Sequence, residues 1–141
     1  MKIFVFGSLL SQDVLNIVLG ENHIRLDKLP IKEISNFQAY YVENEDYPML
    51  VEKEYEVLSG KVITIDNKEH LDRLTHYEGE ENPLKIISAD DSLYAFLADS
   101  TLTPSPKKWD LNNWLQSPAY KDFLERVKKF MSQIELGLDN W

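Results

Sequence analysis

The most informative absence in this 141-residue chain is cysteine, of which there is none. A chain without thiols has no disulfide framework, no cysteine nucleophile and no thiolate ligand for zinc. Basic residues are also scarce, because 15 Lys and Arg stand against 24 Asp and Glu and give a formal net charge of −9. Binding to nucleic acid needs clustered Lys and Arg against the phosphates, so this charge argues against a nucleic-acid partner.

Long hydrophobic runs are missing as well, since every apolar stretch is far shorter than the roughly 20 residues that span a bilayer. We therefore expect no membrane partner. The apolar N-terminal stretch lacks a small-residue cleavage site, so we interpret it as a strand and not as a signal peptide. The composition, 43% hydrophobic and 28% charged, is typical of a soluble globular protein. We expect one domain over residues 1–141, with a cytoplasmic location as the default.

The opening run MKIFVFGSLL is the strongest local pattern. Its β-branched and aromatic residues predict a strand buried on both faces, which ends abruptly at Gly7. A glycine at this point lets the backbone turn and leaves room for close approach. Successive backbone N–H groups after a strand can form a cradle for an anion or oxyanion, to which the Ser8 hydroxyl could add a donor. Such turns are common, so an ordinary turn role for Ser8 stays open.

Spacing and turn residues predict the further elements as far as residue 98. We expect a short helix between Ser11 and Gly20, and a second helix from an Asp66 cap, with Glu69 completing a capping box, to about Glu78. A polar loop is expected over 22–28. The predicted strands are 31–42, as one bent or two short strands, 47–51, 57–65, 84–88 and 93–97, with an exposed acidic loop over 52–56. Gly60 within its strand predicts a bulge or a close backbone approach.

The last third of the chain predicts two helices after a stiff connection over 101–106. Ser105-Pro106 and Ser117-Pro118 each resemble a helix cap followed by proline at the first helical position. The second helix, from Pro118 to about 133, carries an apolar stripe that we interpret as a packing surface. We expect Arg126, Lys128 and Lys129 to lie on a solvated helix face. The tryptophans are expected to anchor the core or a lid: Trp109, Trp114 and Trp141.

Glu78 is the candidate for proton transfer. It follows Leu71 and Leu74 by seven and four residues, so the three side chains share one helix face, which is the buried one. Burial would raise the pKa of this carboxyl group and suit it to exchange a proton near neutral pH. The alternative is that Glu78 forms a salt bridge or lies in water at a frayed helix end. Glu80 and Glu81 lie beyond Gly79 and are expected to be solvated loop charges.

The three histidines do not predict a metal site. His70 and His76 are six residues apart, which places them on different helix faces and not at the four-residue spacing of a ligand pair. We therefore expect surface histidines and no metal. The sequence also lacks the glycine patterns that bind nucleotides, so we expect no nucleotide cofactor.

Four motifs in order resemble the gamma-glutamylcyclotransferase-like family, also called avirulence-induced-gene-like. They are Phe6-Gly7-Ser8-Leu9, Tyr47-Pro48, Gly60 in its strand, and the helix end Leu74-Thr75-His76-Tyr77-Glu78-Gly79. The resemblance covers about residues 1–98. It implies an α+β fold, a small mixed β-barrel with flanking helices, to which helices over about 105–135 form a C-terminal appendage.

The resemblance also implies a chemistry and a set of site residues. The α-amino group of a γ-glutamyl amine or peptide would attack its own γ-carbonyl and release 5-oxoproline and an amine, without a cofactor or a metal. Glu78 would be the catalytic residue, and the substrate-binding residues would be Phe6, Gly7, Ser8, Leu9 and Tyr47. Loops around Asn36, Tyr47 and 109–114 are expected to complete the pocket walls. The expected partner is a small γ-glutamyl molecule, and neither its leaving group nor an oligomeric state follows from the sequence.

The chain departs from the family pattern at three places. Phe6 replaces the usual tyrosine, Thr75 stands where an aspartate is usual, and Asn82-Pro83-Leu84 occupies a region in which a tyrosine often follows the glutamate. These departures keep a second interpretation open, in which the chain is a binding or interaction module that retains the fold without the reaction.

Overall fold

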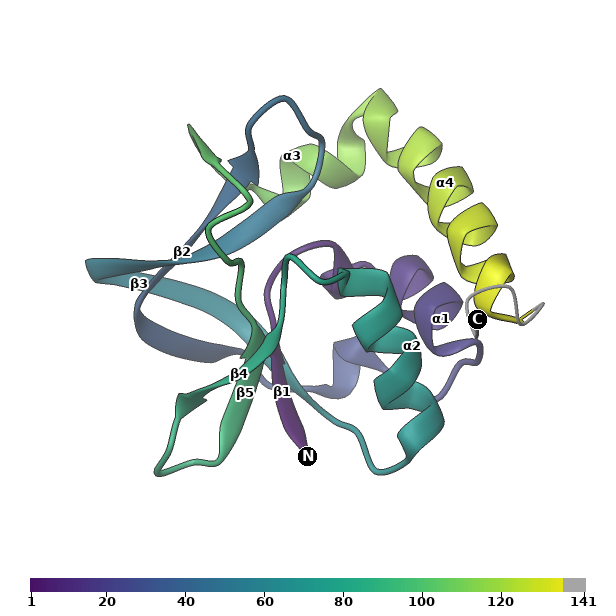
Figure 1. Cartoon of the computed structure of the whole chain (residues 1–141), viewed down its shortest axis with the longest axis horizontal. Coiled ribbons are helices and arrows are strands. Elements are labelled where there is room, and N and C mark those ends of the chain that lie inside the picture. The colour runs from purple at the N-terminus through teal and green to yellow at the C-terminus, as the bar shows by residue number, and fades with distance from the viewer. Residues whose placement is uncertain (136–141) are drawn as a thin grey trace.

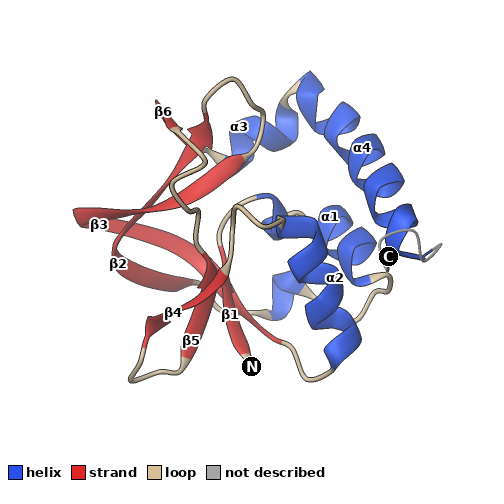
Figure 2. Cartoon of the chain, in the orientation of Figure 1, coloured by secondary structure: helices blue, strands red, loops and turns tan. Residues whose placement is uncertain are grey.

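Six strands form one mixed sheet that curls into a half-barrel, with α1, α2 and α4 on one side of it (Figures 1 and 2). The computed structural model describes residues 1–135. The strands are β1 (Lys2–Val5), β2 (Lys32–Val42), β3 (Pro48–Thr64), β4 (Leu84–Ser88), β5 (Leu93–Phe96) and β6 (Pro104–Lys108), and their order is β4-β5-β1-β3-β2-β6. The helices are α1 (Gln12–Leu19), α2 (Lys68–Glu78), α3 (Leu111–Gln116) and α4 (Pro118–Glu135), with 3₁₀ turns at Ser8–Leu10 and Leu26–Lys28. The expected α+β fold with flanking helices is confirmed.

Strand β1 lies between β3, to which it runs antiparallel, and β5, to which it runs parallel. Side chains of a strand alternate between the two faces of a sheet. Ile3 and Val5 belong to the core under the helices, whereas Phe4 packs on the other face with Ile34 and Leu50. All three β1 side chains are almost fully buried, which confirms the predicted strand with two buried faces.

The main hydrophobic core fills the space between the sheet and the helices. Helix α1 contributes side chains that are almost inaccessible to solvent, and Trp114 of α3 and Met131 of α4 are equally buried. Trp109 packs against this core with its ring centroid 4.9 Å from that of Trp114. Both tryptophans therefore anchor the core as expected, while Trp141 lies outside the described residues.

The ends of α1 and α2 show which capping signals the chain uses. The Ser11 side chain accepts a hydrogen bond from the Val14 amide (3.2 Å), and Gly20 ends α1 with a φ of +81°, as predicted. Helix α2 differs by one residue from the prediction, because Asn67 and not Asp66 accepts the hydrogen bond of the His70 amide (2.8 Å). Aspartate and asparagine are equally good caps, so local sequence alone does not choose between them.

The sequence predicts a hairpin loop over 52–56. This prediction is wrong, because the acidic segment is part of the long strand β3. Pairing with β2 continues on both sides of it, from Ser35 opposite Val57 to Phe37 opposite Glu52. The register shift between these pairs leaves a bulge, which Asn36 closes by accepting a hydrogen bond from the Tyr55 amide (3.1 Å). Strand β2 is correspondingly one continuous strand with an irregularity at this point. The segment is mostly exposed, as predicted, and of its residues only Glu52 pairs with β2.

The segment around Ser105-Pro106 is an edge strand and not a helix start. Strand β6 pairs with β2, with Tyr40 opposite Lys108. Prolines lack an N–H donor and are tolerated at a sheet edge, where one side of the strand has no partner. The following helix, α3, begins at Leu111 and takes its cap from Asp110, which accepts a hydrogen bond from the Asn113 amide (3.2 Å). Helix α4 begins at Pro118 as predicted.

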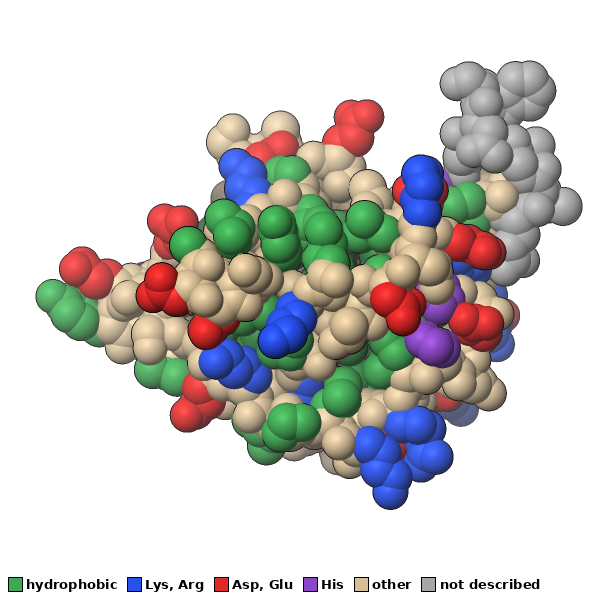
Figure 3. All heavy atoms as spheres, turned by 90° about the horizontal axis from the view of Figure 1, so that it is seen from below, with side chains coloured by type: hydrophobic (Ala, Val, Ile, Leu, Met, Phe, Trp, Pro, Cys, Tyr) green, Lys and Arg blue, Asp and Glu red, His purple; other side chains and the backbone are tan. Residues whose placement is uncertain are grey.

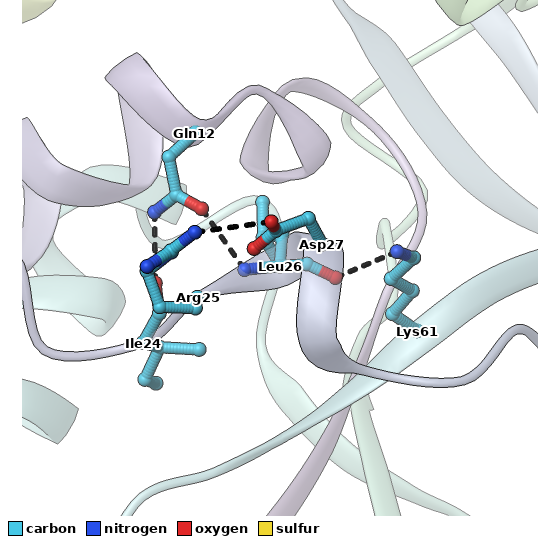
Figure 4. A network of polar contacts seen from close by, with 6 residues as sticks. All are labelled: Gln12, Ile24, Arg25, Leu26, Asp27 and Lys61. Carbon is cyan, nitrogen blue, oxygen red and sulfur yellow. Dashed lines mark hydrogen bonds and ion pairs between the residues drawn. The ribbon is translucent and has the colours of Figure 1, made fainter.

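The connection after α1 is held against its neighbours by a polar network (Figure 4). The Gln12 side chain donates to the Ile24 carbonyl (2.8 Å) and accepts from the Leu26 amide (2.9 Å). Lys61 on β3 donates to the Leu26 carbonyl (2.6 Å). The predicted polar loop over 22–28 therefore contains a 3₁₀ turn with a buried leucine, which the polar composition of the segment hides.

On the face drawn in Figure 3, basic side chains occur in small separate groups with acidic side chains between them.

No helix within residues 1–135 is long and apolar enough to cross a membrane.

Gly60 should not tolerate a side chain. An added Cβ would lie 2.3 Å from the Val5 carbonyl oxygen and 2.7 Å from the Phe4 ring, which confirms the close backbone approach predicted at this glycine. Overpacking of this kind costs roughly 1–3 kcal/mol, so Gly60→Ala should lower the free energy of unfolding by about this amount in urea denaturation. The matched control is Ser59→Ala, at the exposed neighbouring position of β3, and equal stability of the two variants would contradict the packing described here.

Candidate functional site

A cavity of about 370 Å³ lies where the turn after β1, the end of α2 and one face of α4 meet. Its size falls within the range of small-molecule sites, roughly 300–1,000 Å³. The lining residues used below come from four parts of the chain: Phe6, Gly7, Ser8 and Leu9 from the turn; Tyr47 and Pro48 from the start of β3; Tyr77, Glu78, Glu81 and Asn82 from the end of α2 and the loop after it; and Phe123, Arg126, Val127 and Phe130 from α4.

The turn after β1 is shaped by a close contact at Gly7. A Cβ at this position would lie 2.5 Å from Pro48 Cγ, so only glycine lets the turn pack against the start of β3. The chain then forms the 3₁₀ turn Ser8–Leu10, in which the Leu10 amide donates to the Gly7 carbonyl (2.9 Å). The first N–H groups of a helical turn have no partner within the turn. The amides of Ser8 and Leu9 are therefore the donors that this wall can offer.

Helix α2 places Glu78 at the cavity wall. Leu74 on the same face is fully buried and fixes the last turn against the core, and Gly79 ends the helix with a φ of +80°. Removal of the Glu78 carboxyl group from solvent raises its pKa to about 8. Within residues 1–135 no hydrogen bond or ion pair reaches this carboxyl group. It is therefore a carboxyl group that is partly protonated near neutral pH.

Tyr77, directly before Glu78, also reaches the cavity. Its hydroxyl oxygen lies 2.5 Å from Ser8 Oγ, so the end of α2 and the turn after β1 are joined by a hydrogen bond. Burial, and secondarily the neighbouring Glu78, raises the pKa of the Tyr77 phenol far above its ordinary value. The phenol is therefore neutral over the physiological pH range. Tyr77 is not among the site residues predicted from the sequence. Its position next to Glu78 and three residues after Leu74, on the same face of the helix, was a usable signal.

Helix α4 forms the third wall of the cavity. Phe123 and Val127 are buried, and Phe130 is 41% exposed at the rim. Arg126 lies among them and forms an ion pair with Asp46 in the turn between β2 and β3. Its side chain is exposed, as predicted, and it also lines the cavity. The sequence spacing shows that these four residues share one helix face. It does not show which part of the fold that face packs against.

All six residues predicted for the site line this one cavity: Phe6, Gly7, Ser8, Leu9, Tyr47 and Glu78. Burial, followed by the charge of Glu45, raises the pKa of the Tyr47 phenol. Asn36 and the segment 109–114, expected near the pocket, do not line it, because the former closes the β3 bulge and the latter packs in the core. Glu81 is exposed in the loop after α2, as predicted, and it also lines the cavity.

The histidine prediction is wrong for His70, which is buried and not on the surface. Its Nε2 lies 2.7 Å from Glu21 and its Nδ1 lies 3.1 Å from the Asn67 side chain. His76 stacks on Phe130 of α4, with ring centroids 4.5 Å apart. Among the residues that the structure describes, no group of three or more histidine and carboxylate side chains is arranged to hold a metal ion.

Comparison with known proteins finds relatives that align with most of this chain. Two proteins of Arabidopsis thaliana, AIG2-like protein D and AIG2-like protein A, are 25% and 27% identical to this chain. The alignments cover 96% and 92% of this chain and 91% and 81% of those proteins. A solution structure of an Arabidopsis thaliana protein is 26% identical with a TM-score of 0.50, covering 93% of this chain and 90% of that one.

The fold also occurs in an uncharacterised protein from Pyrococcus horikoshii, whose crystal structure is 22% identical, with a TM-score of 0.54 over 77% of this chain and 85% of that one. The sequence profile described as gamma-glutamyl cyclotransferase, AIG2-like, matches residues 3–97. This span contains the four motifs, the turn after β1 and Glu78. The chain therefore belongs to the AIG2-like gamma-glutamyl cyclotransferase family.

Proposed function

We propose that this protein cyclises a γ-glutamyl amine or peptide to 5-oxoproline and releases the amine. The observation that carries the proposal is the placement of Glu78. Its carboxyl group has a pKa of about 8 and faces a cavity that the turn after β1 also lines. A group that gives and takes a proton near neutral pH, opposite backbone donors, suits acyl transfer between two nitrogens.

The reaction needs one proton carrier and no water. The ionised Glu78 takes a proton from the substrate's α-ammonium, and the resulting amine attacks the γ-carbonyl carbon. A C–N bond forms, the carbonyl electrons move onto oxygen, and this oxyanion then collapses as the bond to the leaving nitrogen breaks. Glu78 returns its proton to that nitrogen. The same carboxylate then takes the second proton from the attacking nitrogen and passes it to the released amine, which leaves as an ammonium ion. The 5-oxoproline nitrogen keeps one hydrogen, and the products together have the composition of the substrate.

The cavity would contribute by holding the substrate in a folded conformation. Cyclisation requires the α-nitrogen to approach the γ-carbon, and this ordering of the substrate costs conformational entropy. Binding in the folded conformation meets this cost before the reaction begins, which lowers the activation free energy. The amides of Ser8 and Leu9 are the donors proposed for the developing oxyanion. Phe6, Phe123 and Val127 would exclude water from the reacting atoms and strengthen these electrostatic interactions.

Phe6 favours a second candidate, in which the chain binds γ-glutamyl compounds without converting them. It lines the cavity but offers no hydroxyl group there. Binding of a γ-glutamyl amide, measured by calorimetry, without release of 5-oxoproline would favour this candidate over the enzyme.

Replacing Glu78 tests the proposed proton carrier. Glu78→Gln keeps the size of the side chain and removes its acid–base function, so 5-oxoproline formation should fall at least about 100-fold. The measurement is chromatographic detection of 5-oxoproline with a panel of γ-glutamyl amines and γ-glutamyl peptides. Glu80→Gln is the matched control, because Glu80 is exposed two residues away and does not line the cavity. Equal activity of the Glu78→Gln variant and the wild type would refute the assignment.

The pH dependence of the wild type follows from the raised pKa of Glu78. The free enzyme needs the ionised carboxylate, and the fraction ionised falls as the pH decreases below about 8. The value of kcat/KM should therefore fall about tenfold per pH unit below this point. A glutamate with its ordinary pKa would keep kcat/KM constant down to about pH 5. A flat profile between pH 6 and pH 8 would contradict the proposal.

A further inference from the structure

Two hydroxyl groups meet inside the cavity beside Glu78. Ser8 Oγ, from the turn after β1, and the Tyr77 hydroxyl oxygen, from the last turn of α2, are 2.5 Å apart. Both residues line the cavity, and Ser8 is only 8% exposed. Within residues 1–135 neither hydroxyl has another hydrogen-bond partner. The pair therefore has one proton left to offer to a ligand.

The contact is compatible with either hydroxyl as the donor. A phenol is ordinarily a stronger acid than an aliphatic alcohol, so we take Tyr77 as the donor to Ser8 Oγ. The Ser8 proton then remains available to a ligand. Because the pKa of the Tyr77 phenol is raised by burial, this donor stays protonated at working pH. Ser8 is thus a donor whose direction is set by Tyr77.

Building on the proposed cyclisation, we propose that Tyr77 is a positioning residue which orients the Ser8 hydroxyl to donate to the substrate's γ-carbonyl oxygen. Ser8 also carries one of the two amides of the same wall, so its side chain and its backbone each supply a donor there. The hydrogen bond strengthens as the oxygen gains charge during attack by the α-nitrogen, and the proton stays on Ser8 throughout. The pair should therefore affect kcat more than KM.

The chain contains a matched control pair. Ser11 Oγ and the Tyr120 hydroxyl oxygen are 2.6 Å apart and join the cap of α1 to α4 by the same kind of contact. Neither Ser11 nor Tyr120 lines the cavity. Tyr120→Phe therefore removes a structural tyrosine–serine hydrogen bond without touching the site.

The test is steady-state kinetics of 5-oxoproline release for Tyr77→Phe, Ser8→Ala, the double variant and Tyr120→Phe, together with thermal melts. We expect Tyr77→Phe and Ser8→Ala each to lower kcat about 10- to 100-fold with KM changed less than about threefold. The double variant should be no slower than Ser8→Ala, because Tyr77 acts through Ser8. Tyr120→Phe should keep the wild-type kcat. Ser8→Thr, which retains the hydroxyl, should restore most of the activity and covers the case in which Ser8→Ala does not fold.

Two results would overturn the inference while leaving the proposed function intact. One is a Tyr77→Phe variant with the kcat of the wild type, when Glu78→Gln is inactive. The other is a double variant whose loss equals the product of the two single losses, since independent effects would mean that Tyr77 does not act through Ser8. A wild-type protein that forms no 5-oxoproline from any compound of the panel would overturn the proposed function and this inference together.

Discussion

The fixed position of β1 is the constraint on which the site depends. Its backbone pairs with strands on both sides, and its side chains are buried on both faces of the sheet, so the strand has little room to shift. Gly60 allows β3 to lie against Phe4 and the Val5 carbonyl, and Gly7 allows the turn to lie against Pro48. The turn that follows β1 is therefore placed by the most rigid part of the fold, as a site built on backbone donors requires.

Helix α2 is held in place against this turn from two sides. Leu74 enters the core, and Arg73 donates to the Val18 carbonyl (2.6 Å) at the end of α1, where a cation also interacts favourably with the helix dipole. This anchoring holds Glu78 half-buried at the cavity wall. The raised pKa of Glu78 lowers the stability of the fold at high pH. The folded state binds the proton more tightly than the unfolded chain does, so the free energy of unfolding decreases as the pH rises from the usual pKa range of a glutamate through about 8. A group retained at such a cost is consistent with a function.

Local sequence predicts the parts of the fold that local interactions decide. The strand before Gly7 and the helix between Ser11 and Gly20 follow from residue type, periodicity and caps, and the face shared by Leu74 and Glu78 follows from helical spacing. These suffice to bring Glu78 and the turn after β1 into one hypothesis. The family resemblance then joins them into a site.

The remaining features depend on contacts between distant segments. The acidic residues 52–56 stay in β3 because β2 pairs on either side of them, and Pro104 and Pro106 lie in a strand because β2 offers an edge. The role of α4 as a cavity wall depends on where the helix docks, and its sequence shows only an apolar stripe. The Tyr77–Ser8 contact joins residues 69 positions apart, so no spacing rule reveals it.

The central claim is that the fold holds the Glu78 carboxyl group out of water next to the turn after β1. The most direct measurement is an NMR titration of the side-chain carboxyl carbons in the ¹³C-labelled protein, with the Glu78→Gln variant identifying the signal of Glu78. The account predicts a midpoint near pH 8 for this signal. A midpoint of about 4 to 5, the range of an exposed glutamate, would contradict it.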